Sequence, residues 1–265
     1  MSLRAVSEPA PDRIPPPETS RSVRIEIGVV LAITLGASAV RSVIRILDDL
    51  FKAVPLADQS VAIVVPQAEA SWTDLAYQLV SIGVGLAWGS LGIYLLWRAG
   101  YRLGADIGLD WRWSDLGRAA ALAAVIGIPG IAFYVLAYRL GLNVTVVPAA
   151  LNEHWWSLPV LVLAALENGF LEEVLMVGWL LTRLRQLRVN PWLAIVASAL
   201  IRGMYHLYQG GGQALGNVIM GLVFGYVWWR WRRLWPLIIA HTLMDVVAFV
   251  GYTYLSDLVQ GWLGS

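Results

Sequence analysis

The chain has 265 residues, of which 58% are hydrophobic and only 14% are charged, and 14 are tryptophan. This composition excludes an ordinary soluble domain and indicates an integral membrane protein. The net charge of +1 gives no reason to expect a nucleic-acid partner, and the lack of cysteine excludes disulfides, thiolate metal ligands and a cysteine nucleophile.

The first 21 residues are polar and rich in proline, so we expect residues 1–21 to form a disordered cytoplasmic tail. The basic start is not followed at once by the apolar stretch of a cleavable signal peptide, and the first apolar segment is predicted to be an uncleaved signal anchor. No linker divides the rest, so residues 22–265 are predicted to form a single transmembrane domain.

Apolar runs of about 20 residues, the length that spans a bilayer, follow one another along the chain. They lie near residues 23–47, 74–97, 118–140, 157–182, 191–208, 213–230 and 236–256. The predicted fold class is therefore all-α, a polytopic transmembrane helix bundle of about seven spans.

Arginines gather in alternate loops. They are Arg4, Arg13, Arg21 and Arg24 before or at the start of the first run, Arg98, Arg102, Arg112 and Arg118 after the second, Arg183, Arg185 and Arg188 after the fourth, and Arg230, Arg232 and Arg233 after the sixth. Positively charged loops stay in the cytoplasm, so the N-terminus is predicted to be cytoplasmic and the C-terminus to lie outside. Because the composition and the tail are typical of bacteria, we expect a multi-pass protein of the bacterial plasma (inner) membrane.

Ionisable residues interrupt the apolar runs of the C-terminal half. Glu172 and Glu173 are adjacent in the fourth run, where each carboxylate costs about 2.5–3.5 kcal/mol at the centre of a membrane helix. On an α-helix they point about 100° apart, so we expect them not to share one partner. Polar groups at such a depth indicate a functional site.

Two further helices add polar pairs at a spacing of one turn. Arg202 and His206 share one helix face, and so do His241 and Asp245. A buried glutamate can take a proton from a water molecule, and a histidine can orient that water or stabilise an oxyanion. These residue types are sufficient for water attack on an amide carbonyl. Glu167 and Asn168, one turn earlier, are expected to make supporting polar contacts.

The three patterns resemble those of the CAAX protease and bacteriocin-processing family of intramembrane proteases, which includes the type II CAAX prenyl endopeptidases. The family motifs are EExxxR, FxxxH and HxxxN/D, on separate helices of one bundle. They stand here as EEVLMV from Glu172 to Val177, RGMYH from Arg202 to His206, and HTLMD from His241 to Asp245. The resemblance covers about residues 115–256, which is then the expected catalytic region.

The resemblance implies a role for each matching residue. Glu172 would be the base that activates water, and Glu173 would be its hydrogen-bonded partner. His206 would bind the water or the substrate carbonyl. His241 and Asp245 would complete the site and stabilise the oxyanion, with Asp245 standing where the family often has asparagine.

Two positions depart from the family motifs. Val177 replaces the motif arginine, and Arg202 replaces the motif phenylalanine. We interpret them as one compensated change, in which Arg202 brings to the carboxylates the guanidinium that Val177 cannot supply. If so, Arg202 supports the site.

No cofactor is expected, with zinc as the alternative. Glu172, His206 and His241 could be three zinc ligands with one open position. The HExxH spacing that places ligands and base on one helix is absent, so a glutamate-activated water is preferred.

Functions from three classes stay open. The preferred one is an intramembrane endopeptidase acting on a membrane-embedded or membrane-proximal peptide or protein. Prenylated substrates are implied by the family name only, and the sequence leaves the oligomeric state undetermined. The second is a proton- or ion-coupled transporter, which the lack of an internal repeat disfavours. The third is a catalytically silent scaffold or immunity-type relative, which the replacement at Val177 keeps open.

The depth of the site raises one difficulty. His241 comes only about 9 Å after Trp235 at 1.5 Å per residue, so the site is expected between mid-depth and the cytoplasmic side. His206, in contrast, lies near the predicted outer end of its span.

Overall fold

The computed structural model describes residues 18–263, with side chains up to residue 254. Most of the predicted tail, residues 1–17, lies outside the described residues. The helices are α1 (Ser20–Ile33), α2 (Leu35–Phe51), α3 (Ser71–Arg98), α4 (Leu103–Ile107), α5 (Ser114–Arg139), α6 (Ser157–Glu172), α7 (Leu180–Gln186), α8 (Pro191–Tyr205), α9 (Gly211–Trp231) and α10 (Trp235–Leu263). A π-helical segment, Glu173–Trp179, joins α6 to α7, and single 3-10 turns occupy Leu56–Asp58 and Leu207–Gln209.

All seven predicted apolar runs are helical, so the largely helical fold is confirmed. Within the described residues, three helices are long and apolar enough to cross a membrane, namely α3, α5 and α10. The first run is divided into α1 and α2, which bend by 50° and pass the same test as a pair. The chain is therefore a helical membrane protein.

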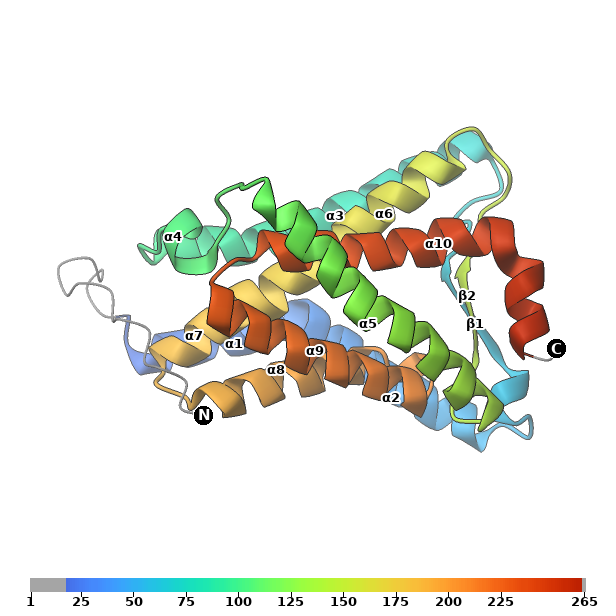
Figure 1. Cartoon of the computed structure of the whole chain (residues 1–265), viewed down its shortest axis with the longest axis horizontal. Coiled ribbons are helices and arrows are strands. Elements are labelled where there is room, and N and C mark those ends of the chain that lie inside the picture. The colour runs from blue at the N-terminus through green and yellow to red at the C-terminus, as the bar shows by residue number, and fades with distance from the viewer. Residues whose placement is uncertain (1–17, 264–265) are drawn as a thin grey trace.

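Two short strands were not predicted. β1 (Ser60–Val64) and β2 (Thr145–Ala149) pair in parallel, with Ser60 opposite Thr145. They lie at one end of the bundle, and α4 and α7 lie at the opposite end (Figure 1). The loops rich in arginine belong to the α4 and α7 end, which we call the arginine-rich end.

Glycines on one face of α3 allow it to approach α6 closely. A Cβ atom at Gly85 would lie 1.6 Å from Oε1 of Glu167, and one at Gly89 would lie 2.6 Å from the Phe170 ring. Gly92 continues this row against the π-helical segment. Small residues let the backbones of membrane helices pack tightly. This contact holds α6 beside α3 (Figure 1), and α6 ends at the first of the two glutamates.

A buried clamp fixes the other end of the same helical stretch. Arg183 on α7 is fully buried and donates to both carboxylate oxygens of Glu26 on α1, at 2.7 and 2.8 Å. It also donates to Glu18 at 2.8 Å, and Trp179 donates to Glu26 at 2.9 Å. The bidentate geometry is the strong form of this interaction. It holds the first helix against the stretch that carries the glutamates.

A second clamp closes the loop between α9 and α10. Arg233 donates to Asp110 at 2.6 Å and to Asp115, whose side chain is fully buried. The hydrogen bond from Arg233 holds the pKa of Asp110 below its ordinary value of 3.8. The Asp110 carboxylate therefore stabilises the fold at neutral pH, and this contribution is lost as the pH falls below that value.

Replacing Arg233 by glutamine is expected to destabilise the protein by about 1.5–3 kcal/mol, because the buried Asp115 loses a charge-assisted hydrogen bond and keeps only the contact with Arg118 at 3.2 Å. The variant should also lose less stability than the wild type between pH 5 and pH 3, since Asp110 loses the interaction that titrates there. Thermal unfolding in detergent measures both effects. Arg230→Gln removes a charge from an exposed neighbour and is the control; equal stability of the two variants would contradict the prediction.

Candidate active site

The two adjacent glutamates are buried at the junction of α6 and the π-helical segment. Glu172 is 3% exposed and Glu173 is 0% exposed. The expectation that they do not share a partner is wrong. One nitrogen of Arg202 lies 3.4 Å from Oε2 of Glu172, and the other donates to Oε1 of Glu173 at 2.6 Å. The guanidinium has two terminal amino groups, so it bridges carboxylates that diverge from one backbone.

The helix is widened immediately after Glu172. Hydroxyl groups bond two carbonyl oxygens of the π-helical segment: Ser198 on α8 donates to the carbonyl of Met176 at 2.7 Å, and Thr182 donates to that of Gly178 at 2.6 Å. Single π-helical turns inside α-helices are frequent at functional sites. The contact with Ser198 also joins this segment to the helix that carries the first histidine.

Glu172 lies between Tyr205 and His206. The Tyr205 hydroxyl donates to Oε2 at 2.6 Å, and Nε2 of His206 lies 3.7 Å from Oε1. Nε2 is buried and has no hydrogen-bond partner in the described part of the chain, whereas Nδ1 lies 3.4 Å from the side-chain nitrogen Nε2 of Gln209. A separation of 3.7 Å is too long for a direct hydrogen bond. It allows one water molecule to contact both atoms.

His206 lies at the same level of the bundle as Glu172, because its Nε2 is 3.7 Å from Oε1 of that residue. α8 ends at Tyr205, and His206 caps it, so the predicted run to residue 208 was too long. A 3-10 turn follows, and Gly210, with φ of 110°, pairs with Asn143 before α9 begins. His206 therefore lies at the end of a short helix that reaches Glu172.

Glu173 connects to the second histidine. His241 places Nδ1 2.7 Å from Oε1 of Glu173 and Nε2 3.6 Å from Oδ2 of Asp245. Asn168 donates to the same oxygen of Asp245 at 2.7 Å. Oε2 of Glu173 is buried without a partner among the described residues. The imidazole is thus held between two carboxylates.

The structure brings all the predicted site residues into one buried or half-buried network across α6, α8 and α10. Its members are Glu172, Glu173, Arg202, His206, His241 and Asp245, with Asn168 and Tyr205 in addition. Glu167 makes no hydrogen bond or ion pair with them in the described part of the chain, and its carboxyl group lies against Gly85 of α3. Tyr205 was not among the predicted catalytic residues, although its i,i+3 spacing from Arg202 places both on one face.

The zinc alternative requires Glu172, His206 and His241 to surround one ion. In the described range of the chain, no three His, Asp or Glu side chains lie in such an arrangement. His241 directs Nδ1 to Glu173 instead. The residues present do not fit a three-ligand zinc site.

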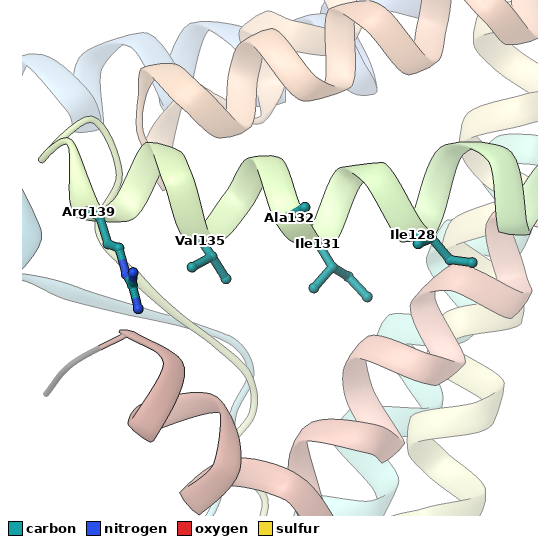
Figure 2. Close-up of a pocket in the computed structure, with 5 residues that line it drawn as sticks. All are labelled: Ile128, Ile131, Ala132, Val135 and Arg139. Atoms are coloured by element: carbon teal, nitrogen blue, oxygen red, sulfur yellow. The ribbon is translucent and has the colours of Figure 1, made fainter.

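A cavity of about 480 Å³ lies away from this network, along one face of α5. Figure 2 shows its lining side chains projecting from α5 toward the space beside α10; they are Ile128, Ile131, Ala132, Val135 and Arg139. The lining carries no carboxylate or histidine. It is an apolar trough on the bundle, not the site of the glutamates.

Comparison with known proteins agrees with the motifs. The family model described as type II CAAX prenyl endopeptidase Rce1-like matches residues 154–247, about a third of the chain. The matched range runs from just before α6 into α10 and contains every member of the network. No curated protein and no solved structure matches the chain. The resemblance inferred from the three motifs is therefore confirmed for this segment.

Proposed function

We propose that this Rce1-like membrane protein is an intramembrane endopeptidase that hydrolyses peptide bonds with a glutamate-activated water. One observation carries the proposal: Oε1 of Glu172 lies 3.7 Å from Nε2 of His206 in a buried site, and this Nε2 has no hydrogen-bond partner among the described residues. A water molecule between them would contact a base on one side and a hydrogen-bonding group on the other.

In the proposed reaction, Glu172 takes a proton as the water attacks the carbonyl carbon. His206 donates a hydrogen bond through Nε2 to the oxyanion that develops on the carbonyl oxygen. When the tetrahedral intermediate collapses, Glu172 returns the proton to the leaving amine, and the products are a carboxylic acid and an amine. The Tyr205 hydroxyl holds Oε2 of Glu172, which keeps Oε1 directed at the water.

Glu173 takes no proton in this scheme. It accepts from Arg202 and contacts His241, so its carboxylate fixes two side chains on two other helices. Arg202 supplies the positive charge that offsets two adjacent buried carboxylates. This weakens the silent-relative alternative, which rested on the replacement of the motif arginine by Val177.

The proposed substrate is a membrane-embedded or membrane-proximal peptide segment, because the network lies within the helix bundle. Prenylated CAAX proteins are named by the family description alone. No feature of the described residues selects a prenyl group, so the substrate is proposed no more narrowly than this.

The test compares membranes from cells that express the wild-type protein or Glu172→Gln, incubated in ¹⁸O-labelled water. New peptide termini, identified by mass spectrometry, should appear with the wild type only and carry ¹⁸O in the new carboxyl group. Addition of EDTA or 1,10-phenanthroline should leave them unchanged, because the described residues form no three-ligand metal site. Loss of cleavage with chelators would contradict the metal-free mechanism, and identical termini from both proteins would contradict the proposed function.

We also propose seven spans with a cytoplasmic N-terminus in a bacterial inner membrane. The arginine-rich end and the two strands lie at opposite ends of the bundle (Figure 1). This arrangement supports the topology, because positively charged loops stay in the cytoplasm. Since the chain lacks cysteine, Trp113→Cys and Trp155→Cys each introduce a single thiol, at positions 78% and 75% exposed. A membrane-impermeant maleimide should label Trp155→Cys in intact cells and Trp113→Cys only after permeabilisation; the reverse result would invert the topology.

A further inference from the structure

Arg232 has an unusual environment in the loop that joins α9 to α10. Its backbone is left-handed, with φ of 53°, and its guanidinium lies 4.5 Å from the centre of the Trp228 ring and 4.6 Å from that of Trp229. All three of its side-chain nitrogen atoms are shielded from solvent, and none has a hydrogen-bond partner in the described part of the chain.

Two buried arginines of the arginine-rich end are paired, whereas Arg232 is only partly buried. Arg183 donates to Glu26 and Arg233 to Asp115. At Arg232 the indole rings contact the guanidinium, and such contacts favour a cation. They do not accept the N–H groups, which lie in the guanidinium plane. A buried donor without an acceptor is costly, and in native proteins it often marks an ion or ligand that completes the site.

The positive charge of Arg232 and its neighbour Arg185 would also attract an anion. Burial and the nearby Arg185 lower the pKa of Arg232 to about 10, and Asp106 opposes this effect. The group therefore remains a cation at neutral pH. The end of α9 favours a positive charge, but the Arg232 side chain bonds none of its carbonyl groups. The site combines the Arg232 guanidinium, which has no hydrogen-bond acceptor among the described residues, with the positive charge of a second arginine.

Tryptophans indicate the depth of this site. Trp231, which is 39% exposed, and Trp235 flank the loop, and the exposed Trp111 packs edge to face against Trp235 at 5.6 Å. Tryptophan belts lie at the level of the lipid headgroups. Basic pockets at this level bind the phosphates of anionic lipids. A phosphate group has several acceptor oxygens that match the donor geometry of a guanidinium.

We propose that Arg232 and Arg185 form a phosphate-binding site at the arginine-rich end, which takes the headgroup phosphate of a phospholipid. This site is separate from the glutamate and histidine network and does not depend on the proposed hydrolysis. Free phosphate has the same chemistry, so the experiment includes both sources.

The purified full-length protein is titrated in detergent with dihexanoyl phosphatidylglycerol or with inorganic phosphate, and bound species are counted by native mass spectrometry. The wild type should bind one phosphatidylglycerol with an affinity about tenfold or more above that of Arg232→Gln, the effect expected for losing a charge-assisted hydrogen bond. Arg230→Gln removes a neighbouring exposed charge and should bind as the wild type does. Stronger binding of inorganic phosphate than of the lipid would assign the site to free phosphate and overturn the lipid assignment.

A second variant keeps the test valid if Arg232→Gln does not fold. Arg185→Gln leaves the contact between Arg232 and the two tryptophans intact, and it should weaken phosphate-group binding severalfold without lowering the melting temperature in the absence of ligand. If Arg185→Gln binds phosphatidylglycerol as the wild type does, or if folded Arg232→Gln does, the proposed site does not exist.

Discussion

Replacing Glu172 by glutamine is expected to lower the rate of peptide hydrolysis by about 10²–10⁴-fold, the usual contribution of a general base. Glutamine has nearly the same shape and can still accept a hydrogen bond from the Tyr205 hydroxyl, which lies 2.6 Å from the Glu172 carboxylate. It cannot take a proton from water. The rate should therefore fall while the folded structure is preserved, as measured by cleavage of an identified substrate and by thermal unfolding.

Glu167→Gln is the matched control for this change. Glu167 belongs to the same helix and is half-buried, but it lies against Gly85 and outside the network. The control variant should cleave at the wild-type rate. If Glu167→Gln is as inactive as Glu172→Gln, loss of any carboxylate on α6 is sufficient, and the assignment of the base to Glu172 fails.

Arg202→Phe is expected to have the largest effect on both stability and activity. It restores the residue type of the family motif but leaves Glu172 and Glu173 buried without the guanidinium they share. Removing one partner from a buried ion pair costs about 3–5 kcal/mol. The variant should unfold at a markedly lower temperature, and any folded fraction should lack activity because the carboxylates no longer keep their positions.

The double variant Val177→Arg with Arg202→Phe should recover much of what the single variant loses. Position 177 is four residues after Glu173 in the same helical stretch, and its side chain is 1% exposed, so an arginine there can reach the carboxylates. Melting temperature and cleavage rate are compared for the wild type, both single variants and the double variant. If Arg202→Phe alone behaves as the wild type, the compensation hypothesis is wrong.

Local patterns were sufficient to predict the helices and most of the network. Apolar runs identify membrane helices because the backbone must satisfy its own hydrogen bonds in lipid. The i,i+4 spacing of His241 and Asp245 places both on one face. In the structure, Nε2 of His241 lies 3.6 Å from Oδ2 of Asp245. The contact of Arg202 with both glutamates required the structure, because it depends on how α8 packs against the π-helical segment.

The features that were missed depend on distant parts of the chain. β1 and β2 are separated by three helices, and each is too short to be recognised alone. The early end of α8 likewise follows from the pairing of Gly210 with Asn143, although the sequence stays apolar to Tyr208. Hydropathy records how well a segment tolerates lipid. It does not record where a neighbouring loop ends a helix.

The row of glycines on α3 has a consequence for genetics. Between Asp74 and Arg98, α3 carries no acidic or basic side chain, yet it packs against the helix that ends at Glu172, and added atoms at Gly85 or Gly89 would collide with that helix. Random mutagenesis for loss of function should therefore recover alleles in two groups. One group alters the ionisable network itself, and the other adds a single methyl group to a helix that contributes no reactive atom.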